Sequence, residues 1–332
     1  MPTFRDFMES ALYDRDTGFY TVREKTADFY TAPELHPAFG AVVADRVAAL
    51  LRRARAANPR ARLSLVEAGA GDGTLAAQMV RRLREGHGDV AADLSVVLVE
   101  RSRRDLTEAA RRVTAFGLPV DACTGLDRLP AFTGVLVSNE LIDALPAHLL
   151  VKSGGKMREL YVDEGREAIG PLSTPELAAA ADTIAPALEE GGRHAVSLEA
   201  RLWMTEAARR LSSGFIVTFD YGKRFSDLTP NVPRAYRAHR LESDLIEAPG
   251  TKDLTVPADF GALIDAGAAA GLELENYESL SRFLIDGGIE RWLAAAAGDG
   301  PEAYAERARL KTLFHPEGMG EAFKVLIQRK AI

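Results

Sequence analysis

The sequence predicts an α/β fold built on a seven-stranded, doubly wound (Rossmann-like) sheet. Two observations lead to this prediction. From residue 63 onward, short apolar runs alternate with segments of helical periodicity, and such alternation is typical of a parallel sheet with helices on both faces. A glycine-rich stretch over residues 66–75 also separates the first apolar run from the first of these helices. This is where α/β proteins place a nucleotide-type cofactor.

Residues 1–60 are predicted to be mostly helical, with one irregular insert. The first helix is indicated by apolar residues at helical spacing, which are Phe4, Phe7, Met8, Ala11 and Leu12. A turn follows at residues 18–20. A second helix is expected to begin at Thr31 or at Ala32-Pro33, because proline suits the first helical turn, and to continue through Val47.

The alternating part of the chain predicts strands over 63–68, 94–99, 119–122 and 133–138, and helices over 74–86 and 102–116. Two apolar runs around Ser153-Gly154-Gly155 then predict a β-hairpin. Because the hairpin interrupts the alternation, we interpret residues 147–200 as an insertion, with an alanine-rich helical part up to residue 188. The sheet resumes over 214–219, and strands near 272–277 and 323–328 complete it.

Composition excludes several classes of protein. The net charge of -7 argues against a nucleic-acid binder, and no apolar run is long enough to span a membrane. The N-terminus resembles neither a signal peptide nor a transit peptide. The single cysteine, Cys123, and six scattered histidines predict no metal site and no internal disulfide. We therefore expect a protein of the bacterial cytoplasm.

The glycine-rich stretch carries chemistry of its own. The glycines let the backbone turn sharply and approach a ligand, so Gly69, Ala70 and Gly71 are predicted to contact a cofactor. Glu67 and Asp72 would repel the pyrophosphate of a dinucleotide. S-adenosylmethionine has no phosphate and carries positive sulfonium and ammonium groups, so nearby carboxylates suit it, and Glu67 is predicted to bind this cofactor. The alternative is a glycine turn without a ligand.

Glu100 follows the apolar run 94–99 directly. An acidic residue at the tip of the second strand is well placed to accept hydrogen bonds from both ribose hydroxyls of a nucleoside cofactor. The alternative is a charge that caps the helix beginning near Ser102.

Several segments together resemble the MidA family of S-adenosylmethionine-dependent methyltransferases. They are residues 28–35, the glycine loop 67–75, the segment 138–146, Asp220-Tyr221-Gly222, residues 236–239 and residues 249–260. Within 138–146, the pattern Asn139-Glu140-x-x-Asp143-Ala-Leu-Pro is the most distinctive. The resemblance covers nearly the whole chain and implies a class I methyltransferase sheet over residues 61–332. It also implies that residues 1–60, with Tyr20, Thr31 and Glu34, form a lid in which Thr31 helps to hold the cofactor. The alternatives are ordinary helix packing for Tyr20 and an N-cap for Thr31.

The chain departs from the family pattern in three places. The family has Gly-Asp-Phe where this chain has Ala27-Asp28-Phe29, and Asp-x-Thr-Ala-His where it has residues 253–257. A glutamine usual before the late Phe-Leu motif is missing near Phe283-Leu284. The cofactor half is therefore matched better than the C-terminal half, and the cofactor is predicted more firmly than the acceptor.

The distinctive motif lies where ligands bind in open α/β sheets, at the carboxyl end of a strand. The family includes an enzyme that methylates arginine. An arginine acceptor stays protonated, and carboxylates could orient it. We hypothesise that Glu140 and Asp143, which would share one face if the segment is helical, bind the acceptor, while Asn139 contacts the cofactor. The alternative is that Asp143 caps a helix and Glu140 binds only the cofactor's ammonium group. Asp220 is predicted to line the acceptor pocket or to begin a turn.

The sequence thus predicts a protein arginine N-methyltransferase with a protein substrate. By resemblance that substrate could be a respiratory complex subunit. A small-molecule methyltransferase and a cofactor-binding assembly factor without turnover are the alternatives. An NAD-dependent dehydrogenase is disfavoured by Glu67 and the Asn139 motif. The sequence leaves the oligomeric state open, a homodimer included.

Overall fold

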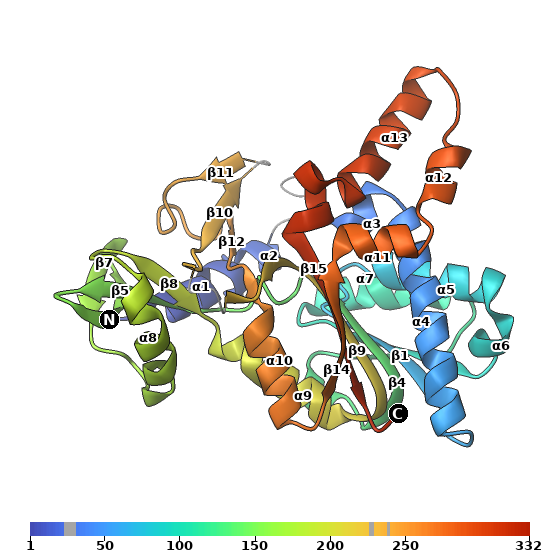
Figure 1. Cartoon of the computed structure of the whole chain (residues 1–332), viewed down its shortest axis with the longest axis horizontal. Helices are drawn as coiled ribbons and strands as arrows, with labels where there is room; N and C mark the ends of the chain where they lie inside the picture. The colour runs from blue at the N-terminus through green and yellow to red at the C-terminus, as the bar shows by residue number, and fades with distance from the viewer. Residues whose placement is uncertain (23–30, 226–228, 238–239) are drawn as a thin grey trace. The chain divides into compact units, whose positions relative to one another are not determined.

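A computed structural model describes residues 1–22, 31–225, 229–237 and 240–332. The chain forms two compact units, each assembled from three segments. Unit 1 comprises Met1–Phe29, Ile142–Leu202 and Lys223–Leu263, and unit 2 comprises Tyr30–Leu141, Trp203–Gly222 and Ile264–Ile332. Figure 1 colours the chain from its N-terminus to its C-terminus.

Unit 2 contains the seven-stranded sheet. Its strands are β1 (Leu63–Ala68), β2 (Leu94–Val99), β3 (Val120–Cys123), β4 (Phe132–Asn139), β9 (Leu211–Lys223), β14 (Glu273–Ser279) and β15 (Phe323–Lys330). They lie in the order β14-β15-β9-β4-β1-β2-β3. The pairings among β3, β2, β1, β4 and β9 are parallel, whereas β15 is antiparallel to both β9 and β14. The predicted fold class, a class I methyltransferase sheet, is confirmed.

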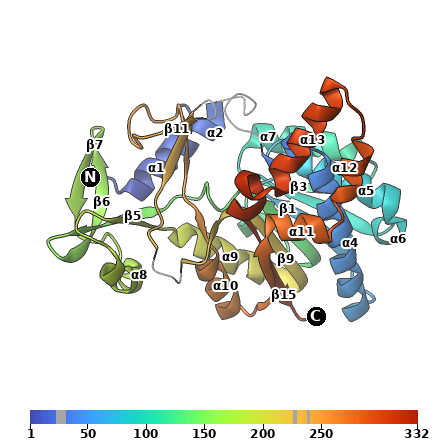
Figure 2. The same cartoon turned by 45° about the horizontal axis from the view of Figure 1, so that its top comes forward.

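The helices of unit 2 are α3 (Ala32–Leu35), α4 (Ala38–Ala57), α5 (Thr74–Gly86), α6 (Gly88–Ala91), α7 (Arg103–Thr114), α11 (Leu280–Asp286), α12 (Glu290–Ala295) and α13 (Pro301–Phe314), with short turns at η2 (Leu126–Arg128) and η6 (Pro316–Gly320). Helix α4 packs beside α5 (Figures 1 and 2). The ring of Phe39 meets Phe219 edge-on at 5.5 Å, and Phe219 meets Phe283 at 5.1 Å. Burying each such ring contributes about 1.5–3 kcal/mol, so these contacts fix α4 and α11 on the sheet.

Two glycines let three strands of this sheet approach closely. Gly134 of β4 pairs with Ser64 of β1 and with Gly214 of β9. Their φ angles, 148° and 135°, are ones that residues with a Cβ rarely adopt. A Cβ at Gly134 would collide with the Ser64 carbonyl oxygen, and one at Gly214 would collide with the Gly134 carbonyl oxygen. Close backbone contact therefore requires glycine in both places.

Unit 1 is built from two small antiparallel sheets. One has the order β7-β6-β5-β8 and the other β11-β10-β12. Their strands are β5 (His148–Ser153), β6 (Lys156–Asp163), β7 (Arg166–Gly170), β8 (Arg193–Val196), β10 (Arg234–Arg237), β11 (Arg240–Glu242) and β12 (Asp253–Thr255), whereas β13 (Ala258–Asp259) belongs to neither sheet. The helical elements are α1 (Phe4–Tyr13), α2 (Phe19–Val22), η3 (Pro175–Leu177), α8 (Ala178–Ile184) and η4 (Ala185–Ala187). Helices α9 (Leu198–Arg210) and α10 (Phe260–Ala269) contribute residues to both units.

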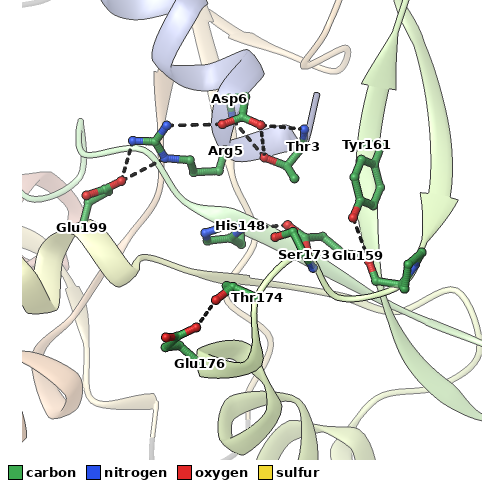
Figure 3. A network of polar contacts seen from close by, with 11 residues as sticks. Thr3, Arg5, Asp6, His148, Glu159, Tyr161, Ser173, Thr174, Glu176 and Glu199 are labelled. Atoms are coloured by element: carbon green, nitrogen blue, oxygen red, sulfur yellow. Dashed lines mark hydrogen bonds and ion pairs between the residues drawn. The ribbon is translucent and has the colours of Figure 1, made fainter. Parts of the chain in front are cut away.

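Helix α1 is tied to the four-stranded sheet by apolar and polar contacts. Phe4, Met8 and Leu12 are fully buried in a cluster with residues of β5 and β6. Thr3 caps the helix through a reciprocal pair of hydrogen bonds with Asp6. Figure 3 shows the polar network around this end of the helix. There the buried Glu159 accepts hydrogen bonds from His148 (2.7 Å) and from the backbone amide of Ser173 (2.6 Å).

Most predicted elements of the sheet are confirmed, and β1, α5 and β2 have the predicted limits. The expectation of one helix from residue 31 to residue 47 was wrong, because His36 has extended backbone angles and separates α3 from α4. The helical stretch expected up to residue 188 is limited to α8 and two short 3-10 turns. Strands β7, β8 and β10–β12 were not anticipated. The division into a lid over 1–60, a core over 61–332 and an insertion over 147–200 stays a prediction.

Candidate active site

The glycine loop connects β1 to α5 at the carboxyl edge of the sheet. The amides of Gly69 and Ala70 both donate to the carbonyl oxygen of Val99, at 2.9 and 3.1 Å. Gly73 has a φ of 82°, and a Cβ there would lie 2.7 Å from the Cα of Ala109. The loop is therefore a tight turn that packs against β2 and α7, and only glycine is permitted at its last position.

Glu67 lies beneath this loop. Its side chain is 3% exposed and accepts a hydrogen bond from the backbone amide of Ala76. Burial raises the pKa of Glu67 well above its ordinary value of 4.5, and the charges of Asp72 and Glu100 act in the same direction. Its Oε2 has no hydrogen-bond partner among the described residues. The residue therefore joins the end of β1 to the first turn of α5.

We expect Glu67→Gln to remove one source of pH-dependent stability. A carboxyl whose pKa is raised on folding binds its proton more tightly in the folded state, so its contribution to stability is present at low pH and is lost as pH rises through the folded pKa. Above about pH 4.5, the stability of Glu67→Gln relative to wild type should rise by up to about 1.4 kcal/mol per pH unit until that pKa is passed.

Urea unfolding of both proteins across this pH range measures the difference. Glu85→Gln, on the exposed side of α5, is the matched control and should run parallel to wild type. If the free energy of unfolding depended on pH equally in Glu67→Gln and in wild type, the raised pKa of Glu67 would be contradicted.

Glu100 holds the loop from the neighbouring strand. Its Oε2 accepts from the amide of Gly71 at 2.9 Å, and its Oε1 accepts from the amide of Ser102 at 2.8 Å. Ser102 itself caps α7 through its side chain, which accepts from the amide of Asp105. Glu100 thus lies at the tip of β2 as expected and contacts the glycine loop. Its contact with ribose hydroxyls stays a prediction.

Asn139 and Glu140 lie at the end of β4. Glu140 Oε1 accepts from Asn139 Nδ2 at 2.8 Å and from the amide of Ala32 at 3.0 Å. The backbone of Glu140 has a φ of 51°, in the left-handed region, where residues other than glycine are uncommon. Asn139 Oδ1 is buried and has no hydrogen-bond partner among the described residues. This acceptor and the carboxylate beside it suit the positive end of a cofactor.

Thr31 and Asp220 belong to the same unit as the loop. Thr31 caps α3, and its amide and hydroxyl both bind the carboxylate of Glu34, at 2.8 and 3.0 Å. Asp220, on β9, is fully buried, and its Oδ1 accepts from the amide of Tyr221 at 2.9 Å. Asp28, Phe29 and Tyr30 of the first signature, and Ala238 and His239 of a later one, lie outside the described residues.

The segment that contains Glu140 and Asp143, whose shared face depended on a helix, is not helical. Residues 140–147 form bends and turns, so the two carboxylates do not share a helix face, and Asp143 does not cap a helix there. A left-handed Glu140 and the proline at position 146 are both incompatible with a regular helix through this segment. Asp143 belongs to unit 1, where its carbonyl oxygen accepts from the amide of Val256 at 2.8 Å.

In unit 1, Asp143 lies in an acidic cluster that we define as Asp143, Asp253 and Tyr20. The two aspartates are 9% and 8% exposed. The Tyr20 hydroxyl donates to Asp253 Oδ1 at 2.8 Å. Burial, followed by the negative charges of Asp253 and Asp143, raises the pKa of Tyr20 well above 10. The ring of Tyr20 also stacks on that of Tyr13 at 5.6 Å. The sequence assigned no role to Asp253, because it lies 233 positions from the tyrosine that it binds.

Comparison with known proteins decides the family. A family model described as "Putative S-adenosyl-L-methionine-dependent methyltransferase" matches residues 43–278. The chain belongs to this family. The predicted membership in the MidA group and the predicted methyltransferase activity are confirmed, and the cofactor of this methyltransferase is S-adenosylmethionine.

Relatives match this methyltransferase over nearly its whole length. The rat protein arginine methyltransferase NDUFAF7, mitochondrial, is 27% identical over 97% of this chain and 79% of its own length. Its Drosophila melanogaster homologue is 25% identical over 97% and 80%. A COG1565 superfamily member from Burkholderia thailandensis, solved with bound S-adenosyl-homocysteine, has a TM-score of 0.83 and 28% identity over 99% of this chain and 88% of its own.

The residues present fit this cofactor. It supplies a methyl group on a positively charged sulfur. The glycine loop provides close backbone approach, Asn139 provides an unpartnered acceptor, and Glu100 provides a carboxylate at the tip of β2. The cofactor would be held by Glu67, Gly69, Ala70, Gly71, Glu100 and Asn139, and Thr31 would contribute from α3. These assignments of individual residues stay predictions.

Two further findings concern the described part of the chain. It contains no group of three or more His, Cys, Asp or Glu side chains arranged to hold a metal ion. None of its helices combines the length and apolar character needed to cross a membrane.

Proposed function

We propose that this methyltransferase transfers the methyl group of S-adenosylmethionine to an arginine side chain of a protein. The observation that carries the proposal is the acidic cluster of Asp143, Asp253 and Tyr20, in which two carboxylates are almost completely buried. The names of the rat and fly relatives, which are protein arginine methyltransferases, support the same acceptor. By resemblance, a respiratory complex subunit is a candidate substrate.

Two buried carboxylates beside one hydroxyl suit a guanidinium group. A guanidinium binds carboxylates through paired, charge-assisted hydrogen bonds. Arginine remains protonated at neutral pH, so the enzyme must orient one nitrogen for in-line attack on the methyl carbon. We assign binding of the guanidinium to Asp143 and Asp253, with Tyr20 fixing the position of Asp253.

Glu140 and Asp220 are the remaining candidates for contact with the acceptor. Glu140 follows the strand that carries Asn139, and its left-handed backbone is held by the hydrogen bond from its amide to the carbonyl oxygen of Phe219. Strained backbone at the end of a strand is common at functional sites. We propose that Glu140 stabilises the positive charge that the acceptor retains during transfer, and that Asp220 contributes negative charge at the same sheet edge.

Asp253→Asn tests the proposal. The substitution retains the shape of the side chain and an acceptor for Tyr20 but removes the charge, so methyl transfer to protein should fall by about tenfold or more. The measurement is incorporation of labelled methyl from S-adenosylmethionine into proteins of a cell extract, followed by hydrolysis and separation of methylated amino acids.

Cofactor affinity, measured by isothermal titration, should be unchanged in Asp253→Asn. Asp163→Asn, at the exposed end of β6, is the matched control and should transfer at the wild-type rate. Label found in a small-molecule fraction, or on a residue other than arginine, would contradict the proposed acceptor. Cofactor binding without any transfer would favour an assembly factor without turnover.

A further inference from the structure

Unit 1 contains a pocket separate from the acidic cluster. It is lined by residues of β8, by the first turn of α9 and by the segment 256–262, and it encloses about 490 Å³, including space open to solvent. Small apolar side chains form much of its wall, among them Ala195, Ala200 and Val256. Three polar residues of this wall, His194, Asn231 and Asp259, have hydrogen-bonding capacity that the described residues do not use.

His194 presents a donor to the pocket. Its side chain is 8% exposed, and its Nδ1 accepts from the amide of Asn231 at 3.1 Å. The proton of the neutral ring is therefore on Nε2. The edge-on packing of Phe225 fixes the plane of the ring. Burial lowers the pKa of His194 while nearby Asp259 opposes this shift, which favours the neutral ring.

Asn231 presents an acceptor. It is 3% exposed, and its Nδ2 donates to the carbonyl oxygen of Pro257 at 2.9 Å. This contact fixes the orientation of the amide, so Oδ1 is the free end. Oδ1 is buried and has no partner among the described residues. An unsatisfied buried acceptor of this kind costs about 1–3 kcal/mol, which a ligand with a donor could recover.

Asp259 adds negative charge. Its Oδ1 accepts from the amides of Gly261 and Ala262, at 2.9 and 3.2 Å, and thereby caps α10. Within the described part of the chain, its second oxygen makes no hydrogen bond. The pocket therefore offers one neutral donor, one neutral acceptor and one carboxylate oxygen against apolar walls, and Ser197 and the exposed Arg201 also line it.

We propose that this pocket binds a basic residue of a polypeptide. The cationic head donates to Asn231 Oδ1 and to the free oxygen of Asp259, the carbonyl of the same residue accepts from His194 Nε2–H, and the methylene groups pack on the alanine and valine walls. A simple amine would leave the His194 donor unused, and an anionic ligand without a donor would leave Asn231 Oδ1 unsatisfied.

The position of the pocket in the chain connects it to the proposed acceptor site. Asp253 of the acidic cluster lies on β12, and the same segment continues directly through Val256 and Pro257 to Asp259. A polypeptide with a basic residue in this pocket would thus be bound by the segment that also supplies Asp253. The inference concerns binding alone and does not depend on arginine being the methyl acceptor.

The test is an NMR titration of the histidine ring signals of the full-length protein, with the His194 signal assigned from His194→Gln. The probes are acetyl-lysine N-methylamide, its neutral isostere acetyl-norleucine N-methylamide, and butylamine, which has the charge but no peptide group. We expect the lysine probe to shift the His194 signal and to bind at least about tenfold more tightly than the other two.

Asp259→Asn is the decisive variant, because asparagine also caps helices while lacking the charge. This substitution should weaken binding of the lysine probe about tenfold or more. The matched control is Asp244→Asn, since Asp244 Oδ1 also accepts from two backbone amides, those of Ile246 and Glu247, in the same unit but away from the pocket. Its affinity should remain within about twofold of wild type.

Three results would overturn the inference. They are equal affinity of Asp259→Asn and wild type, equal binding of the norleucine probe, and water alone at Asn231 in a crystal soaked with the lysine probe. Equal binding of butylamine would indicate a site for small amines in place of a polypeptide. None of these results bears on the labelled-methyl assay, so the proposed function and this inference fail separately.

Discussion

Gly134→Ala is expected to destabilise unit 2 strongly. The new Cβ would collide with the carbonyl oxygen of Ser64 on the adjacent strand, and the φ of 148° would be strained for alanine. Backbone strain and overpacking each cost about 1–3 kcal/mol. Because Gly134 and Ser64 both lie on central strands, the backbone of neither can move without disturbing the sheet. A loss of about 3 kcal/mol or more follows.

Urea denaturation measures this loss as a lower midpoint with an unchanged slope. Gly88→Ala is the matched control, since a Cβ at this position would have no other atom within 4 Å and the backbone is helical. It should leave stability unchanged or raise it by up to about 1 kcal/mol. If the urea midpoint of Gly134→Ala equalled that of the control, β1 and β4 would be able to move apart without a loss of stability. The contact between Gly134 and Ser64 would then not constrain the sheet.

Glu100→Ala is expected to weaken binding of S-adenosylmethionine by about 10- to 100-fold. The substitution removes the predicted acceptor for the ribose hydroxyls, and hydrogen bonds to charged groups contribute about 1.5–3 kcal/mol. It also removes the two contacts, from the amides of Gly71 and Ser102, that hold the glycine loop against β2. Losing the ribose contact and losing the loop contacts should both weaken binding of S-adenosylmethionine. The loss of affinity should therefore exceed that caused by a substitution on the protein surface.

Isothermal titration with S-adenosylmethionine measures this effect, with NAD as a ligand that should bind neither protein. Glu108→Ala is the matched control, because the carboxylate of Glu108 pairs with Arg111 on the surface of α7. Its affinity should equal that of wild type. If Glu100→Ala also bound as tightly as wild type, Glu100 would be a structural support of the loop and would not contact the ribose.

The sequence predicts the central sheet well because its strands are buried on both faces. Leu94–Val99 is buried at every position, and a continuous apolar run between polar turns identifies such a strand directly. The glycine loop is equally local, since its three glycines with positive φ lie within five residues. These features are specified by neighbouring residues, so periodicity and turn composition are sufficient to find them.

Two strands of unit 1, β7 and β10, could not be predicted in this way. Arg166–Gly170 forms an edge strand of mostly exposed residues, and Arg234–Arg237 has only four residues with a basic residue at each end. Neither has an apolar run or a clear alternation, because each depends on pairing with a distant strand. The break at His36 was missed for a related reason. Its ring accepts from the amide of Ala38 at 3.0 Å and so favours a fresh helix start.

The candidate site shows the same contrast. Glu67, the glycines, Glu100 and Asn139 could be found from their places at strand ends. Asp253, His194 and Asn231 could not, since the groups that they contact are supplied by remote segments. A motif shows which residues occur together along the chain, but burial and orphaned hydrogen-bonding atoms become visible only after folding.

The division of each unit into three segments has a consequence for synthesis of the protein on the ribosome. Helix α1 is made before the rest of unit 1, yet its buried face packs on β5, β6 and β12, and β12 ends at Thr255. At about 5–20 residues per second, the apolar side chains of α1 wait on the order of tens of seconds for their last partners. During that interval Phe4, Met8 and Leu12 are available to chaperones. Since unit 1 closes only when residue 263 has emerged, no fragment cut from either end of the chain contains one whole unit alone.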